Sequence, residues 1–312
     1  PSSWMRSRRF SRWAGESRRH SWRRCKKRRR SFGHPARPEN GRGMEARRII
    51  AAAGAERFYA GIDLGTYKTI AIIIDETGMP RAARMRRTEV ARSGLIVDYV
   101  GALNTTRDLM EEMRKHCPIL IEQGATSFPH QTEYANLKTT THILEGVGLE
   151  VLNVLDEPTA ANQVLEIKNG AIVDVGGGTT GIAVIKDGEV IYTNDEATGG
   201  VHLSLVLAGN HKISYEEAEE IKIDRRRHQE VLSIVRPVIE KIASIAASYL
   251  KEFDTIEKVC LVGGTCELEG FADIVADNIG LETFRPAVPQ LITPFGIALS
   301  CLNASADRKR GA

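Results

Sequence analysis

Cysteine is scarce in this sequence and follows no recognisable pattern. The 312 residues contain 5 cysteines. These are Cys25, Cys117, Cys260, Cys266 and Cys301. Their number is odd and no CxxC pair occurs, so neither a disulfide framework nor a zinc site is indicated. An iron–sulfur activator ATPase, which needs a cysteine pair at a subunit junction, is excluded for the same reason. A reducing cytoplasm is the simplest setting for such a chain.

The sequence also has no hydrophobic run of the roughly 18 to 20 residues that would cross a bilayer. It is nevertheless 42% hydrophobic and 27% charged. That composition is enough for one large or two medium domains with a buried core. The sequence therefore predicts a soluble chain that does not have a membrane as its partner.

Acidic residues are rare in the first part of the chain. Residues 1–57 contain 18 Lys and Arg but only 4 Asp and Glu, a net charge of +14, whereas the remaining residues carry −11. The basic run at 23–30, with three tryptophans nearby, could bind nucleic acid or an anionic membrane. The segment lacks apolar periodicity, however, and Met44 lies shortly before the first predicted strand. We expect a disordered basic arm, or sequence translated ahead of the true start, and no specific nucleic-acid partner for the rest.

The most informative segment is DVGGGTTG at 174–181. Short runs rich in β-branched residues flank it at 171–175 and 182–185, so its glycines are predicted to form the tip of a β-hairpin. The glycines also fit GxGxxG, but a dinucleotide-binding turn leads from a strand into a helix, and no helix follows here. The pattern instead favours a phosphate-binding turn, with ATP as the ligand.

A second segment of the same design, FYAGIDLGTYKTIAIIID, occupies 58–75. Aligning Asp63 with Asp174 places the copies 111 residues apart, which suggests a duplicated lobe rather than a solenoid, whose repeats span roughly 20 to 50 residues. Each turn offers backbone N–H groups and a threonine hydroxyl, from Thr66 or Thr179, to phosphate oxygens. Two facing carboxylates suit Mg²⁺. Two ordinary hairpins with glycine turns are the alternative.

Strands and helices alternate beyond residue 58, which is typical of an α/β fold. Strands are predicted within 118–129 and over 149–158 and 258–264, and helices over 131–146, 159–168, 228–253, 269–278 and 293–302. The helix at 228–253 is the longest, and its apolar residues at helical spacing are expected to face a core.

Six motifs occur in the order expected of the actin-like and DnaK-type ATPase superfamily. They are FYAGIDLGTYKT, VLDEPTAANQVL, VDVGGGTTGIAVI, AEEIKID, CLVGGTCELEGF and TPFGIALS. The chain resembles this superfamily from about residue 58 to residue 302. Within it, LDEPTAAN, TGGVHLSLVLAG and LVGGTCELEG are similar to the chaperone-like proteins of ethanolamine utilisation. Ordered agreement of several motifs is far more specific than any single glycine pattern.

The resemblance implies an actin-like ATPase fold of the α/β class, with two ribonuclease-H-like lobes around a nucleotide cleft. Lobe I is expected at 58–168 and lobe II at 169–292. A C-terminal helix at 293–302 would return to lobe I, and 303–312 would form a disordered tail. The segments 75–117 and 209–228 are short, so the outer subdomains are expected to be reduced.

Three acidic residues match the catalytic positions of the superfamily. Asp63 and Asp174 match the pair that holds Mg²⁺, largely through water. Glu157 matches the residue that positions the water attacking the γ-phosphate, and alignment of that water is much of what phosphoryl transfer requires of a protein. On its residue type alone, Glu157 could instead cap the helix that follows Pro158.

The resemblance also implies a set of contacts to ATP or ADP from both lobes. These residues are Gly65, Thr66, Tyr67, Lys68, Gly176, Gly177, Gly178, Thr179, Thr180, Gly199, Gly200, Glu219, Lys222, Gly263, Gly264 and Thr265. Glu219 and Lys222 match the members that reach the ribose and base, and their spacing places them on one helical face. On sequence alone they could equally belong to a solvated helix surface. Lys68 is inferred from the strand pattern and not from the resemblance: it lies two residues beyond Thr66 on the same side of a strand and could reach the β- or γ-phosphate.

The function implied is that of a cytoplasmic ATP-binding protein and weak Mg-dependent ATPase. Its lobes would close on Mg-ATP and change the surface shown to a protein client. By resemblance that client is ethanolamine ammonia-lyase or a component of its bacterial microcompartment, with which the chain would associate. Slow hydrolysis is expected, because the lysine that contacts the transferred phosphate in heat-shock chaperones has no counterpart here. An actin-like filament and a non-hydrolysing ATP-binding scaffold remain alternatives.

Overall fold

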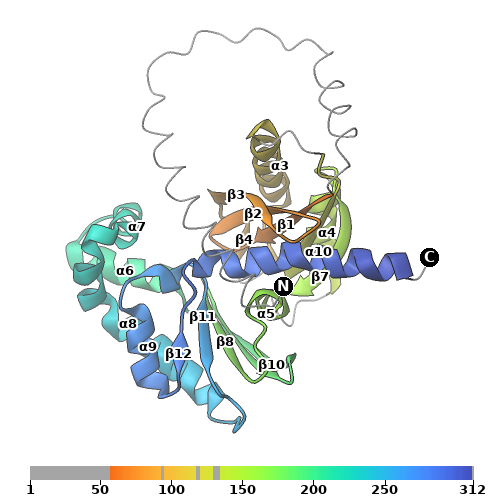
Figure 1. The fold of residues 1–312 in the computed structure, drawn as a ribbon. Coiled ribbons are helices and arrows are strands. Elements are labelled where there is room, and N and C mark those ends of the chain that lie inside the picture. The colour runs from red at the N-terminus through yellow and green to blue at the C-terminus, as the bar shows by residue number, and fades with distance from the viewer. Residues whose placement is uncertain (1–56, 93–94, 117–119, 129–133, 311–312) are drawn as a thin grey trace, which may run out of the picture.

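The computed structural model describes residues 57–92, 95–116, 120–128 and 134–310 (Figure 1). The basic segment and Met44, for which the sequence predicts a disordered arm or a false start, lie outside the described residues. Within the described part of the chain, no helix is both long enough and apolar enough to cross a membrane.

Lobe I is built on a five-stranded mixed sheet in the order β3-β2-β1-β6-β7. An antiparallel meander is followed by two strands that run parallel to β1. The strands are β1 (Phe58–Leu64), β2 (Lys68–Asp75), β3 (Pro80–Arg87), β6 (Gln123–Phe128) and β7 (Glu150–Asp156). A short ribbon of β4 (Ala91–Arg92) and β5 (Leu95–Ile96) follows β3.

Lobe II repeats this plan in the order β10-β9-β8-β11-β12. Its strands are β8 (Gly170–Val175), β9 (Thr180–Lys186), β10 (Glu189–Glu196), β11 (Val259–Val262) and β12 (Thr283–Phe284). Again a meander of three antiparallel strands is followed by two parallel ones. The predicted α/β fold with two copies of one design, each opening on a β-hairpin, is confirmed.

Both faces of the lobe I sheet are buried, because residues of alternating direction along each strand meet different helices. Ile62 and Ile73 share a core with α3 (Tyr99–His116) and α4 (Tyr134–Glu145). Ile70 and Ile72 share a second core with α5 (Glu157–Leu165) and α10 (Ile292–Arg310). β1 and β2 therefore read as nearly continuous apolar runs instead of alternating ones.

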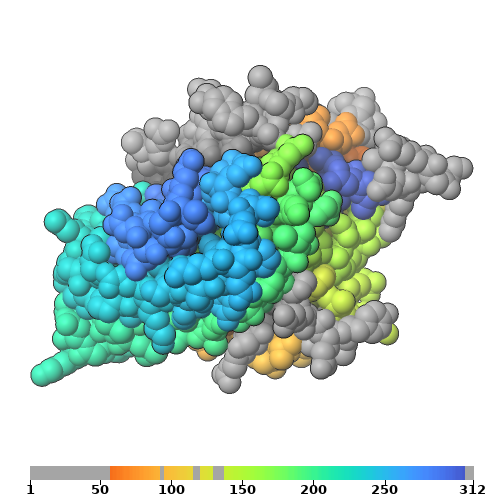
Figure 2. Space-filling model, turned by 90° about the horizontal axis from the view of Figure 1, so that it is seen from below, coloured from red at the N-terminus to blue at the C-terminus, as the bar shows by residue number. Residues whose placement is uncertain are grey.

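Four helices cover the outer face of the lobe II sheet (Figure 1). They are α6 (Gly200–His211), α7 (Tyr215–Ile223), α8 (His228–Leu250) and α9 (Phe271–Ile279). The longest, α8, buries an apolar face that includes Val231, Val235 and Ile239. Seen from below, the cyan-to-blue part of lobe II forms one broad surface, and green residues separate it from the yellow-green part of lobe I (Figure 2). Three short 3₁₀ turns, η1 (Arg225–Arg227), η2 (Thr265–Glu267) and η3 (Pro289–Leu291), complete this lobe.

The helices α5 and α10 lie between the two sheets and join them (Figure 1). A single hydrophobic core contains Ile70 of lobe I, Ile172 of lobe II and Phe295 of α10. Two glycines permit the close packing: a Cβ on Gly296 would lie 1.7 Å from the carbonyl oxygen of Ala160, and a Cβ on Gly61 would lie 2.5 Å from the nitrogen of Ala298.

The last helix is longer than the sequence suggests. A disordered tail is predicted from residue 303, yet α10 continues to Arg310. No proline or glycine occurs from residue 303 to residue 310, so the helix has no local reason to stop at 303. The side-chain amide of Asn303 also donates a hydrogen bond of 3.1 Å to the Oε1 of Gln163 on α5.

Candidate functional site

The turns between β1 and β2 and between β8 and β9 meet where the lobes face each other. A Cβ on Gly177 would lie 2.6 Å from the Cβ of Tyr67, and a Cβ on Gly178 would lie 3.2 Å from the Cγ2 of Thr66. The backbone of one turn thus passes directly against side chains of the other, and only glycine leaves room for this. The structure therefore brings the two predicted phosphate-binding turns together.

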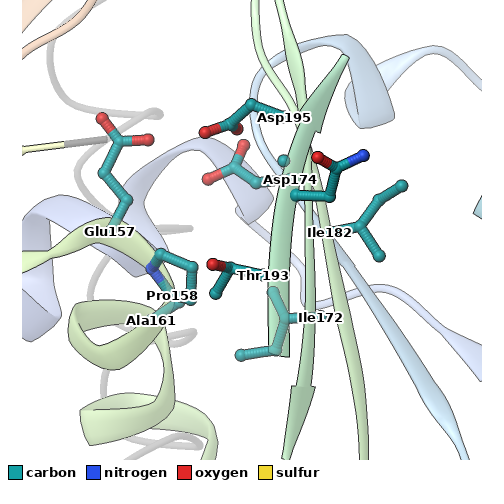
Figure 3. Close-up of a pocket in the computed structure, with 10 residues that line it drawn as sticks. Glu157, Pro158, Ala161, Ile172, Asp174, Ile182, Thr193 and Asp195 are labelled. Atoms are coloured by element: carbon teal, nitrogen blue, oxygen red, sulfur yellow. The ribbon is translucent and has the colours of Figure 1, made fainter. Parts of the chain in front are cut away.

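Carboxylates gather beside these turns. Asp63 and Asp174 are the second-last residues of β1 and β8, and Glu157 begins α5. Glu157, Asp174 and Asp195 line a pocket of about 340 Å³, open to solvent, and their carboxylates lie at the same end of it (Figure 3). Its other end is formed by apolar side chains, among them Pro158 and Ile172. The pocket has one wall from α5 of lobe I and one from the sheet of lobe II.

Asp195 is a member of this group that the motifs do not identify. It lies on β10 directly opposite Gly181 of β9. A Cβ on Gly181 would come within 3.0 Å of the Oδ1 of Asp195, so the last glycine of the glycine-rich segment makes room for that carboxylate. The cross-strand pairing of the hairpin is the signal that would locate Asp195, and it requires knowing the register of β9 and β10.

The carboxylate of Glu157 is not used as a helix cap. The backbone N–H of Thr159 donates a hydrogen bond of 2.9 Å to the Oδ1 of Asp156, which is the N-cap. The helix accordingly begins at Glu157, two residues earlier than predicted, with Pro158 in its first turn, where proline is well tolerated. The alternative that Glu157 caps the helix is therefore wrong, and its side chain points into the pocket (Figure 3).

Burial and mutual repulsion of these carboxyl groups change their pKa values. Burial, and then the charge of Asp174, raise the pKa of Asp63 to about 7, while Lys68 opposes the rise. The pKa of Glu157 is raised well above its usual range by burial and by the charges of Asp63 and Asp174. Burial also raises the pKa of Asp174, although Thr293 donates to its Oδ2 at 3.1 Å. A cation bound beside these three carboxyl groups would favour their ionised forms.

The donors fit a hard cation held through water. Carboxylate oxygens are the ligands that Mg²⁺ prefers, and this ion usually keeps several of its waters. In the described residues, no three or more His, Cys, Asp or Glu side chains are close enough to hold a metal directly. Asp63 and Asp174, one from each lobe, are the two carboxylates that the sequence predicts to hold Mg²⁺.

Lys68 extends from lobe I to lobe II. Its Nζ donates a hydrogen bond of 2.8 Å to the Oε1 of Gln290. A Cβ on Gly264 would lie 2.7 Å from the same Nζ. Lys68 also opposes the rise in the pKa of Asp63 and of Asp174, so its charge lies near both carboxylates as well as beside the turn that contains Gly264.

The carbonyl of Gly176 is the point around which several predicted residues assemble. It accepts hydrogen bonds from the backbone N–H of Gly200 at 3.0 Å and from the hydroxyl of Thr265 at 2.7 Å. A Cβ on Gly199 would lie 2.9 Å from this oxygen. Thr180 differs: it is buried, and its hydroxyl donates to the carbonyl of Thr198 at 2.7 Å, so this side chain is already engaged away from the cleft.

Glu219 and Lys222 lie inside the protein and do not form a solvated surface. Glu219 is 2% exposed. The Nζ of Lys222 donates to the carboxylate of Glu219 and, at 2.8 Å, to the carbonyl of Gly200 at the start of α6. The alternative of a solvated helix surface is therefore wrong for this pair, which lies next to the second glycine turn.

The raised pKa of Asp63 predicts a pH dependence of stability in the nucleotide-free protein. Folded Asp63 binds a proton more tightly than unfolded aspartate, whose pKa is near 3.8. Its contribution is thus full below about pH 4 and is lost as the pH rises through about 7. We expect the free energy of unfolding, measured by urea titration at several pH values, to fall over this range. The fall should be smaller for Asp63→Asn, which should be more stable than the parent at about pH 8.

Asp75 is a useful comparison because its pKa is lowered, whereas that of Asp63 is raised. Burial opposes its ionisation, but hydrogen bonds from Thr77, Met79 and Arg81 outweigh this and lower its pKa. Its stabilisation is present at neutral pH and is lost on acidification, so Asp75→Asn should destabilise the protein near neutral pH. If the free energy of unfolding of Asp63→Asn depended on pH as that of the parent does, the raised pKa of Asp63 would be contradicted.

Comparisons with known proteins agree on a family. The chain is 39% identical over 250 residues to ethanolamine utilization protein EutJ of Escherichia coli K12, which covers 80% of this chain and 88% of that protein. The crystal structure of EutJ from Carboxydothermus hydrogenoformans superimposes with a TM-score of 0.76 at 40% identity, over 83% of this chain and 99% of the other. The resemblance noted from the motifs is confirmed.

More distant matches share the fold. MreB 5 of Spiroplasma citri, in a structure with bound AMPPNP, gives a TM-score of 0.63 at 14% identity, over 82% of this chain and 99% of that one. Family models for type IV pilus assembly protein PilM and for MreB/Mbl protein match residues 158–295 and 82–224. The actin-like fold is thereby shown for this chain.

Proposed function

The chain belongs to the family of ethanolamine utilization protein EutJ, and on this premise we propose that it binds Mg-ATP between its lobes and hydrolyses it slowly. The observation that carries the proposal is the convergence of Asp63, Asp174 and Glu157 beside two glycine turns, one from each lobe. Support also comes from MreB 5, which has the same fold and was solved with AMPPNP.

The residues on the two sides of the cleft have different tasks in this proposal. The turns at Thr66 and Gly177 would bind the phosphates with backbone N–H groups, since glycine allows the backbone to approach closely. Asp63 and Asp174 would hold Mg²⁺ through water, and the ion would supply the positive charge that offsets the phosphate oxygens. With that charge present, the pKa of Glu157 falls and its carboxylate can accept a hydrogen bond from a water and aim it at the γ-phosphate.

Contacts from both lobes make the nucleotide a switch. A ligand that touches Asp63 in one lobe and Asp174 in the other favours the closed arrangement by its differential affinity for it. After hydrolysis and release, the lobes would open and present a different surface to a protein partner. We assign this partner to ethanolamine utilisation, as ethanolamine ammonia-lyase or a component of its microcompartment, and place the protein in the cytoplasm.

Asp174→Asn tests the nucleotide site. Removing one of the two metal-holding charges is expected to weaken Mg-dependent ATP binding at least about tenfold, because each charge-assisted contact contributes roughly 1.5 to 3 kcal/mol. Titration calorimetry with Mg²⁺ and then with EDTA measures this. Asp187→Asn is the matched control: Asp187 lies in the exposed β9–β10 turn with φ of 54°, a conformation that asparagine also tolerates. Equal Mg-dependent affinity of Asp174→Asn and the parent would remove Asp174 from the metal site.

The same variants test the switch. The full chain is used to capture proteins from a lysate of cells grown on ethanolamine, once with ATP and once with ADP. We expect a protein of ethanolamine utilisation to be enriched with one nucleotide only, and this difference to disappear for Asp174→Asn but not for Asp187→Asn. Identical captures with both nucleotides would overturn the switch while leaving nucleotide binding intact.

A further inference from the structure

The buried carboxylate of Glu219 receives donors from both lobes. Within lobe II, its Oε1 accepts from the Oγ of Ser204, the Nζ of Lys222 and, at 3.3 Å, the hydroxyl of Tyr215. From lobe I, the Nη2 of Arg87 donates to its other oxygen, Oε2, at 3.1 Å. Glu219 therefore links α7 of lobe II to the last residue of β3 in lobe I.

Tyr67, in the turn between β1 and β2, contacts both Glu219 and Arg87. Its hydroxyl hydrogen-bonds to Glu219, and the guanidinium of Arg87 lies 5.2 Å from the centre of its ring, which is within the range of a cation–π interaction. Tyr67 and Arg87 thus form one stacked unit that reaches from lobe I to a single carboxylate of lobe II. Tyr67 also packs against Gly177, so the unit adjoins both glycine turns.

The two carboxylate oxygens of Glu219 differ in which lobe supplies their donors. Oε1 accepts three donors from lobe II, and these three bonds do not depend on how the lobes are arranged. Oε2 faces lobe I, where Arg87 holds it. Because Glu219 is 2% exposed, a ribose hydroxyl that donates to this carboxylate has to take the place of a donor already bound there, and at Oε2 that donor is Arg87. Arg87 is itself 53% exposed, so it can move into solvent at little cost.

We propose that Arg87, Tyr67 and Glu219 form an interlobe latch that closes the nucleoside end of the cleft when no nucleotide is bound. An incoming nucleoside displaces Arg87 from Oε2 and so opens the latch. This inference rests on the proposed nucleotide site, whose occupation it regulates. A closed latch reduces the fraction of molecules able to bind, and the apparent affinity for nucleotide falls by that fraction.

Arg87→Ala removes the latch, and Arg86→Ala is the matched control. Arg86 is the preceding residue of the same strand and is 41% exposed, but it pairs with Asp108 and Glu112 of α3 inside lobe I. In the nucleotide-free full chain, we expect amide hydrogen exchange in α7 and in the turn at Tyr67 to be about threefold to tenfold faster for Arg87→Ala, as fits a partly exposed ion pair. Exchange in Arg86→Ala should match the parent there.

Binding of ADP provides the second measurement. By calorimetry, Arg87→Ala should bind ADP about threefold to tenfold more tightly than the parent, since the nucleoside no longer competes with Arg87. Arg86→Ala should stay within about twofold of the parent. Arg87→Met keeps the aliphatic stem over Tyr67 without the charge, and it replaces Arg87→Ala in both measurements if that variant does not fold.

The outcomes separate the latch from the nucleotide site. Faster exchange in α7 with no ADP binding by any variant, the parent included, would support the latch and overturn the proposed function. Unchanged exchange, with ADP bound equally by all variants, would overturn the latch alone. Weaker ADP binding by Arg87→Ala or Arg87→Met would also overturn it, because Arg87 would then be a ligand of the nucleotide and not its competitor.

Discussion

Gly296→Ala is expected to lower the free energy of unfolding by about 2 to 4 kcal/mol, at the upper end of what overpacking costs. Its Cβ would lie 1.7 Å from the carbonyl oxygen of Ala160, which is backbone and cannot rotate away. Either α10 must separate from α5 or α5 must shift, and both changes disturb the core that joins the two sheets. Alanine gains about 1 kcal/mol over glycine in a helix interior, which offsets only part of this loss.

Gly209→Ala is the matched control for this prediction. Gly209 also lies within a helix, α6, but nothing is within 4 Å of the position where its Cβ would be. Here the helical preference of alanine is unopposed, so the variant should equal or exceed the parent in stability by up to about 1 kcal/mol. The free energies of unfolding of the parent, Gly296→Ala and Gly209→Ala are measured by urea titration. If Gly296→Ala were as stable as Gly209→Ala, the tight contact of α10 with α5 would be wrong.

The hairpins were predictable from sequence because each is a local feature. In β8 and β9, apolar β-branched runs flank a glycine turn. The turn is so short that the second strand must run antiparallel to the first. The matching pattern at 58–75 then predicted the duplication, and the structure has two sheets of identical strand order. Asp63 and Asp174 could be identified because they hold the same place in these two local patterns.

Residues that depend on pairing between distant segments could not be found in this way. Arg87 ends an edge strand with the sequence PRAARMRR, in which few residues favour a strand and four arginines resemble a solvated surface. Its partner Glu219 lies 132 positions away. Gln290 and Thr293, which contact Lys68 and Asp174, likewise reach the cleft only once lobe II has folded. Their roles follow from tertiary contacts and have no local signature.

Helix ends were misplaced for a related reason. The sequence predicts a start at Thr159, yet Asp156 provides the cap and α5 starts at Glu157. Asp and Glu are adjacent here and both are acceptable near a helix N-terminus, so their order alone does not say which one caps. The structure decides it, because only the side chain of Asp156 accepts from the N–H of Thr159, and Glu157 is left for the pocket.

Glu157→Gln is expected to reduce the rate of ATP hydrolysis about 100-fold or more, the range that loss of a positioned acid or base produces. Glutamine has the same length and can still fill the space at the start of α5, but its amide oxygen is a much weaker acceptor for the proton of an attacking water. Affinity for Mg-ATP should change little or rise slightly, since one of the crowded negative charges beside Asp63 and Asp174 is removed.

Slow ATP hydrolysis with unchanged Mg-ATP affinity in Glu157→Gln would show that Glu157 acts in the reaction and is not needed only for the fold. Hydrolysis and affinity are measured by phosphate release in single turnover together with calorimetry on the same preparations. Asp156→Asn, one residue earlier, is the matched control: asparagine caps helices as well as aspartate does, so this variant should hydrolyse ATP within about twofold of the parent. A Glu157→Gln protein that hydrolyses ATP as fast as Asp156→Asn would show that the carboxylate in the pocket does not position the water.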